Sequence, residues 1–172
     1  MAAKEYFPTV GKIKFEGKES KNPMAFHYYD AEKMVLGKPM KDWLKFAMCW
    51  WHTLGKASSD KFGGETRTYE WDQKSTVLER AIAKMDAGFE FMQKLGIEYY
   101  CFHDIDLIED TNDIEQYEAN MKAITDYALE KMKAKADYCS ISYDGDFCKI
   151  VEVLNFPYEP LWLIYMAPVS SV

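Results

Sequence analysis

The sequence has no excess of basic residues and no long apolar run. It carries 21 lysines and arginines against 28 aspartates and glutamates, which gives a formal net charge of -7. Surfaces that bind nucleic acids or anionic membranes need a basic face, so neither partner is expected. The most apolar stretch, PLWLIYMAPV near the C-terminus, is too short for a bilayer, which takes roughly 20 residues. The start, MAAKEYF, also lacks the apolar core of a signal peptide.

Cysteine is scarce and widely spaced. The four cysteines, Cys49, Cys101, Cys139 and Cys148, form no CxxC pair. This usage favours a protein of the reducing cytoplasm. With 172 residues and 48% hydrophobic content, the chain has enough material for one domain with a hydrophobic core, or for a piece of a larger one. A soluble enzyme is the first expectation.

The order of the predicted elements indicates an α/β protein. A capping box, Thr76 followed by Glu79, marks the start of a helix that ends before Gly96. An apolar, β-branched and aromatic run follows at residues 97–103, and a second amphipathic helix begins near Asn112. Such alternation favours parallel strands joined by right-handed crossovers.

Further elements are predicted upstream. The segment AFHYY, residues 25–29, is expected to be a strand that lies parallel to residues 97–103. The stretch MKDWLKFAMCWWHTL, residues 40–54, has its aromatic side chains at helical spacing, so it is expected to be a helix packed on the core. The connection at residues 55–72 is long for a structureless loop, which is typical of a functional one.

The most reactive stretch is IEYYCFHDIDL, because it ends in His103, Asp104 and Asp106 at the carboxyl edge of the expected sheet. If Asp106 accepts a hydrogen bond from one ring nitrogen of His103, the other nitrogen becomes more basic, which suits a general acid/base. In the alternative, His103 bonds a backbone carbonyl and the aspartates cap the following loop. A single HDxD offers too few ligands for a metal. His27 and His52 are expected to be packing residues.

Five stretches carry a resemblance to a known family. They are KEYFPTVGKIKFEGKESKNPMAFHYYD, WLKFAMCWWHTL, FGGETRTYEWD, DAGFEFMQKLGIEYYCFHDIDL and IEQYEANMKAITDYALEKMK. Together they resemble the N-terminal third of class II xylose isomerase, most closely its bacterial and anaerobic-fungal branch, from about Lys4 to Lys133. The resemblance implies an α/β fold that is part of a TIM (β/α)₈ barrel. It also implies interconversion of D-xylose and D-xylulose, or of D-glucose and D-fructose, with two divalent metals.

The same resemblance implies roles for individual residues. His103 corresponds to the histidine that assists opening of the sugar ring, and Asp106 to the carboxylate that orients it. Trp51 resembles the tryptophan that walls the sugar pocket, and Phe62 the aromatic residue that one subunit contributes to its neighbour's site. Asp104 also matches, with a less direct role. The family implies a homo-oligomer, a tetramer when intact, that uses Mg²⁺, Mn²⁺ or Co²⁺.

The resemblance stops near Ala134. Residues 1–134 are therefore expected to be the N-terminal part of the barrel, and residues 135–172 a divergent aromatic tail left by truncation or a frameshift. The metal ligands and the catalytic lysine of the family lie beyond this point, so none is mapped here. We therefore expect an incomplete, inactive form of the isomerase. One alternative is a non-catalytic fragment that self-associates or binds intact isomerase subunits, and another is a module that binds sugar without turnover.

Overall fold

A three-stranded parallel sheet organises the described part of the protein. The computed structural model describes residues 4–55 and 66–134, and the backbone of residues 139–142. The strands are β3 (Ala47–Cys49), β4 (Tyr99–Phe102) and β5 (Cys139–Ser142), in the order β3-β4-β5. Both pairs are parallel, and Cys49 lies opposite Cys101. The expectation of a mixed α/β protein with parallel strands is confirmed.

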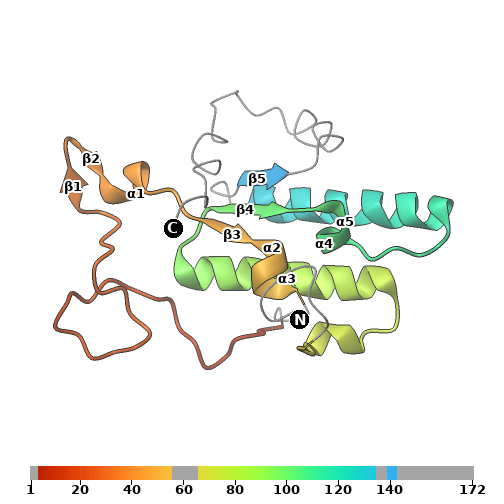
Figure 1. Cartoon of the computed structure of the whole chain (residues 1–172), viewed down its shortest axis with the longest axis horizontal. Coiled ribbons are helices and arrows are strands. Elements are labelled where there is room, and N and C mark those ends of the chain that lie inside the picture. The colour runs from red at the N-terminus through yellow and green to blue at the C-terminus, as the bar shows by residue number, and fades with distance from the viewer. Residues whose placement is uncertain (1–3, 56–65, 135–138, 143–172) are drawn as a thin grey trace, which may run out of the picture.

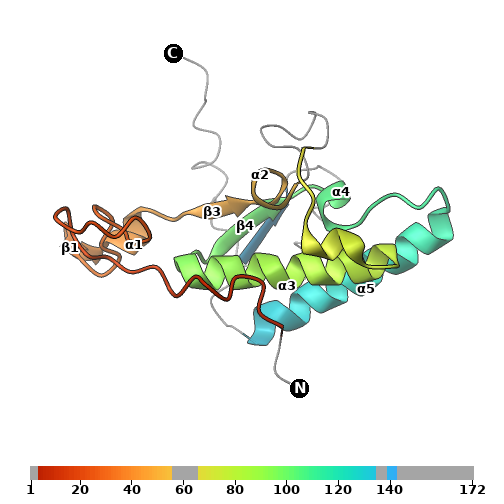
Figure 2. The same cartoon turned by 90° about the horizontal axis from the view of Figure 1, so that it is seen from below.

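Two long helices, α3 (Val77–Leu95) and α5 (Ile114–Ala134), lie together along one face of this sheet, as Figures 1 and 2 show. The Thr76 hydroxyl accepts from the Glu79 backbone N–H at 3.1 Å, and the Glu79 carboxylate accepts from the Thr76 N–H at 3.0 Å. The helix stops at Gly96, whose φ of 71° lies in the left-handed region that glycine adopts without steric cost. The predicted helix and both of its end signals are confirmed.

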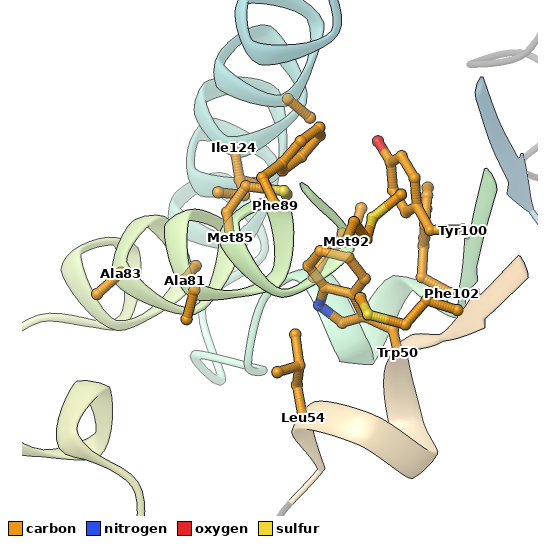
Figure 3. Close-up of a cluster of buried hydrophobic side chains, with 14 of the residues drawn as sticks. Trp50, Leu54, Ala81, Ala83, Met85, Phe89, Met92, Tyr100, Phe102 and Ile124 are labelled. Atoms are coloured by element: carbon orange, nitrogen blue, oxygen red, sulfur yellow. The ribbon is translucent and has the colours of Figure 1, made fainter. Parts of the chain in front are cut away.

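The core lies between these helices and the sheet (Figure 3). Helix α2 (Trp50–Leu54) turns its first and last side chains toward α3, and β4 contributes Tyr100 and Phe102. The Trp50 ring is 1% exposed, and its centroid lies 5.2 Å from that of Tyr100. Gly88 on α3 makes room for it, because a Cβ there would lie 2.5 Å from the Cη2 atom of Trp50. A close approach of helix and indole therefore requires glycine at this position.

The remaining elements are short. They are β1 (Met34–Val35), β2 (Lys38–Pro39), α1 (Met40–Trp43), the 3-10 helix η1 (Glu70–Gln73) and α4 (Asp104–Leu107). The antiparallel pair β1-β2 and α1 lie beyond the amino end of β3 (Figure 1). Helices α2 and α4 follow β3 and β4 directly, so both lie at the carboxyl ends of the strands. In the part of the chain that the structure describes, no helix combines the length and apolarity needed to cross a membrane.

The predicted strand at residues 25–29 is wrong. Only Phe26 forms a bridge, to Phe15, and the strand beside β4 is β3. The surrounding segment folds back on itself instead: the Phe26 N–H donates to the Lys14 carbonyl at 2.8 Å, and a ring nitrogen of His27 bonds the Asn22 carbonyl at 2.9 Å. These local polar contacts satisfy the backbone without a longer ladder.

The predicted helix at residues 40–54 is wrong as a single element. Strand β3 interrupts it, with α1 before and α2 after. Trp43 and Phe46, expected in the core, are 47% and 51% exposed, whereas Trp50 is buried. A short apolar run has no periodicity that separates a strand from a helix, so pairing with β4 decides the outcome.

Strand β5 has no counterpart among the predicted elements. Residues 139–142 pair with β4 along its whole length. Two further stretches of the tail whose composition suits strands, residues 148–156 and 161–166, lie outside the described residues. The boundary between residues 134 and 135 stays a prediction.

Candidate functional site

Strand β4 carries the candidate site at its carboxyl end. Side chains alternate between the two faces of a strand. Tyr100 and Phe102 point to the helix layer, where Tyr100 packs against Phe89 at 5.5 Å between ring centroids. Cys101 and His103 therefore belong to the opposite face. His103 is also the residue at which the chain leaves β4 and begins α4, so its backbone is held by both elements.

The imidazole of His103 and the carboxylate of Asp106 form a close pair. The distance from Nδ1 of His103 to Oδ2 of Asp106 is 2.8 Å, and the two side chains are 16% and 11% exposed. The same Oδ2 accepts from the backbone N–H of His103, also at 2.8 Å. The predicted approach of the two groups is confirmed. The alternative, in which an aspartate caps the segment after the strand, is also correct in part. The Asp106 carboxylate both caps the start of α4 and holds the His103 ring.

This geometry selects a tautomer of the histidine. A carboxylate accepts hydrogen bonds and donates none, so the proton of a neutral His103 ring lies on Nδ1. The basic nitrogen is then Nε2. Because the backbone N–H and the ring N–H hold Asp106 from two directions, the carboxylate cannot rotate away without losing both bonds. The pair has the preorganisation that a general acid/base requires.

Trp51 lies directly against this pair. Its ring centroid is 4.5 Å from that of His103, and the two planes are tilted by 53°. Trp51 comes from α2, and the parallel register of β3 and β4 brings the start of α2 beside the end of β4. The indole is half-buried. Together, the three side chains form an aromatic and polar surface at the carboxyl end of two neighbouring strands.

Of the other residues singled out in the sequence, Asp104 faces α5, His52 borders this surface through its contact with Trp51, and Phe62 is not described. The Asp104 carboxylate accepts from the Ile105 N–H at 2.7 Å. Burial, and then the nearby charge of Asp104, raise the pKa of Tyr117 on α5 above its ordinary value. Asp104 therefore faces α5, and its role stays a prediction. His52 is exposed and its ring lies against Trp51, so the expectation of a packed residue is wrong. Phe62 lies outside the described residues.

No metal site is formed by the residues that the structure describes. Within residues 4–55 and 66–134, no three side chains of His, Cys, Asp or Glu lie close enough together to hold an ion. His103 and Asp106 use one another as partners, and two groups make an incomplete ligand set. The described residues therefore do not fit a divalent metal.

A separate cavity of about 260 Å³ lies between the start of the chain and η1. It is lined mostly by aromatic and apolar side chains, among them Tyr6, Phe7, Leu54 and Trp71. None of His103, Asp106 or Trp51 lines it. The cavity is therefore distinct from the candidate site.

Comparison with known proteins gives a consistent result. The chain is 66% identical over 131 residues to a xylose isomerase of Phocaeicola vulgatus, and 61% identical to one of Bacteroides thetaiotaomicron. It is 53% identical to xylose isomerase 2 of Xanthomonas campestris. The matches cover 76% of this chain but about 30% of each relative, at the N-terminal part. No protein-family model matches the sequence. The chain is thus a partial xylose isomerase-like protein.

Proposed function

We propose that this chain supplies the first βα units of a sugar isomerase that acts on D-xylose, and that His103 with Asp106 opens the sugar ring. The observation that carries the proposal is the 2.8 Å hydrogen bond between His103 Nδ1 and Asp106, at the carboxyl end of β4 and beside Trp51. Relatives named xylose isomerase at 61–66% identity support the reaction class.

Ring opening of a pyranose moves one proton from the anomeric hydroxyl to the ring oxygen. His103 Nε2 suits this transfer, because Asp106 holds the other nitrogen and stabilises the imidazolium that forms when the proton is taken up. The indole of Trp51 offers an apolar face against which the C–H groups of a sugar ring pack, and it shields the imidazole from water on that side. His103 thus transfers the proton, Asp106 orients the ring and Trp51 packs against the substrate.

The complete fold and the metals belong to the proposal as well. The parallel order β3-β4-β5, with α3 and α5 on one face, fits the beginning of a (β/α)₈ barrel. Divalent metals, Mg²⁺, Mn²⁺ or Co²⁺ by the resemblance, would polarise the oxygens on the two neighbouring carbons between which the hydride shifts. The described residues do not fit such an ion. By the resemblance, its ligands lie in the part of the relatives that this chain does not match.

A chimera tests the role of the pair. The matched 131 residues of this chain replace their counterparts in the Phocaeicola vulgatus relative, which is 66% identical there. The chimera is expected to convert D-xylose to D-xylulose. His103→Gln should lower kcat by about 10²–10⁴, the usual contribution of a general acid/base. Asp106→Asn should reduce it less, because the ring remains but is oriented less well.

A matched control for the chimera is His52→Gln. His52 is exposed on α2, and its ring contacts the same indole as His103 does. Its substitution should leave kcat within about twofold, because surface substitutions outside a site have small effects. Equal kcat values for the unchanged chimera and the His103→Gln form would refute the proposed proton transfer.

The 172-residue chain by itself is expected to show no measurable conversion of D-xylose with added Mg²⁺, Mn²⁺ or Co²⁺. Loss of the metal contribution removes several kcal/mol of transition-state stabilisation, and each 1.36 kcal/mol is about tenfold in rate. The assay uses purified chain, each metal in excess and detection of the ketose. Turnover that needs metal and disappears in His103→Ala would show that the chain assembles a complete site.

A non-catalytic role in association is the second candidate. Large apolar side chains are exposed in the region that contains β1, β2 and α1, most of all Leu36, at 90%. Exposed apolar patches mark surfaces that other protein covers. In this reading, the chain binds a second copy of itself or an intact isomerase subunit through that region. Association of the chain, measured by light scattering, together with the absence of turnover would support this role over catalysis.

A further inference from the structure

Two cysteines lie next to one another in the sheet. Cys49 ends β3 and Cys101 lies within β4, and the parallel register pairs them directly. Their Sγ atoms are 3.7 Å apart. Cys101 is 2% exposed, whereas Cys49 is partly exposed. One thiol of the pair is therefore accessible to a small molecule, and the other lies behind it.

The backbone spacing permits a covalent bond between them. Neighbouring strands lie roughly 4.8 Å apart, and a disulfide joins Cα atoms that are about 4.4–6.8 Å apart. In-register residues of parallel neighbours project to the same face of the sheet. We propose that Cys49 and Cys101 form a reversible cross-strand disulfide when the protein meets a small peroxide, a modification that is separate from the proposed isomerase function.

The chemistry balances with one hydrogen peroxide per disulfide. The thiolate of Cys49 attacks one peroxide oxygen, the O–O bond breaks and water leaves, which gives a sulfenic acid at Cys49. The thiolate of Cys101 then attacks that sulfur, the S–O bond breaks and a second water leaves. In total, the two thiols lose two electrons and two protons. The two leaving oxygens take up these protons, so the peroxide is reduced to two molecules of water.

The pair lies just before the candidate site on both strands. Trp51 follows Cys49 by two residues, within α2, and His103 follows Cys101 by two, so the cysteine pair directly precedes the two residues whose rings are in contact. Closing the sulfurs from 3.7 Å to a bond of about 2.05 Å draws the two strand ends together. The contact of Trp51 with His103 then changes with the redox state of the pair.

The experiment uses the full chain with Cys139→Ser and Cys148→Ser, so that Cys49 and Cys101 are the remaining thiols. Hydrogen peroxide is added to the folded chain, and intact mass is followed with time. The mass is expected to fall by that of two hydrogen atoms. Digestion should yield one peptide pair linked through Cys49 and Cys101, and dithiothreitol should restore the starting mass. Adding Cys49→Ser should abolish the link, with circular dichroism showing that this variant folds.

The rate of link formation in the unfolded chain is the reference for how much the fold brings the two sulfurs together. The link should form at least about tenfold faster in the folded chain than in the same chain in urea, because the sheet holds the sulfurs together. Equal rates, or stable addition of oxygen at Cys49 with no link, would overturn the proposal. Oxidation should also change tryptophan fluorescence, and Trp51→Phe should remove most of that change. A change that persists in full in this variant would contradict the coupling to the candidate site.

Discussion

The helix layer and the N-terminal segment at residues 4–46 are stabilised by different forces. In the layer, Met85, Met92 and Ile124 are at most 1% exposed and lie against the sheet. In the segment, eight large apolar side chains are 44% to 90% exposed: Phe15, Met24, Tyr28, Met34, Leu36, Trp43, Leu44 and Phe46. Apolar burial therefore stabilises the first region, while the second uses its apolar side chains little within the described chain.

The start of the segment is held by polar contacts to α3, together with the rings of Tyr6 and Phe7, which pack against the edge of the core. The Glu90 carboxylate accepts from the backbone N–H groups of Tyr6 and Phe7, at 2.6 and 2.9 Å. The Lys94 ammonium lies 2.9 Å from Glu90 and 2.8 Å from Glu5, and it donates to the Phe7 carbonyl. One helix therefore serves both regions, with apolar side chains toward the sheet and one charged pair toward the segment.

Removal of the largest core side chain should have the greatest effect on stability. Trp50→Ala is expected to cost about 3–5 kcal/mol, because Trp50 is 1% exposed and the site around it is closely packed. Urea unfolding followed by circular dichroism measures the loss. Trp43→Ala is the matched control: the same substitution at a side chain that is 47% exposed, with one indole hydrogen bond to the Val35 carbonyl. If both variants lose the same stability, apolar burial does not distinguish the two regions.

Gly88→Ala should also destabilise the helix layer, by about 1–3 kcal/mol, although alanine favours helices. The added Cβ would lie 2.5 and 2.9 Å from two atoms of the Trp50 ring, which is buried and rigid. A double-mutant cycle with Trp50→Phe, measured by urea unfolding, tests the cause. The smaller ring should recover much of the loss, and strict additivity of the two changes would show that the clash is not with Trp50.

Glu90→Gln should loosen the N-terminal segment at neutral pH while it leaves the core packed. The amide accepts hydrogen bonds less strongly than the carboxylate and loses the ion pair with Lys94, at a cost of about 1–2 kcal/mol. Hydrogen exchange of the Tyr6 and Phe7 amides should accelerate by about tenfold. Glu118→Gln, which removes a charge from an exposed position on α5, is the control and should leave both amides unchanged.

At acid pH, the wild type and the Glu90→Gln variant should have the same free energy of unfolding. Burial raises the pKa of Glu90, but the two backbone N–H groups and Lys94 lower it more, so the net pKa lies below its usual value of 4.5. A carboxyl whose pKa falls on folding stabilises the folded state above its unfolded pKa, and this contribution is lost as pH falls through the folded pKa. The stabilities of the two proteins, from urea unfolding, should converge as the pH falls below 4.5 and through the lower pKa of the folded state. A constant difference across this range would assign the effect to packing.

The contrast between the two regions also sets how much of the fold can be predicted from the sequence. The bounds of helix α3 are predictable to within a residue because its signals, Thr76 with Glu79 and then Gly96, act within one turn of the ends they define. The sequence around β3 resembles a helix. The spacing between Trp50 and the apolar residues before it suits a helix as well as a strand. What makes residues 47–49 a strand is β4, which lies 52 residues further along the chain.

The candidate site also combines a contact that can be predicted from the sequence with contacts that cannot. His103 and Asp106 are three residues apart at a strand end, so their pairing follows from local geometry and is predictable from spacing. The contact of Trp51 with His103, and the pairing of Cys49 with Cys101, both depend on the register of β3 against β4. No local pattern contains that register. Only resemblance to a family therefore points to Trp51, and no signal in the sequence points to the cysteine pair.

The smallest effect on stability, and the sharpest test of the N-terminal segment, comes from Leu36→Asp. Leu36 is 90% exposed, so a charge there should change the free energy of unfolding by less than about 0.5 kcal/mol. If the exposed apolar side chains of the segment meet a second copy of the chain, the same charge must be desolvated in that contact and should weaken it. Light scattering over a range of concentrations should show association of the wild type and a monomer for Leu36→Asp. Lys122→Gln on α5, at a side chain that is also highly exposed, lowers the net charge by the same one unit and is the control. Association that survives Leu36→Asp would mean that the segment is not the contact surface.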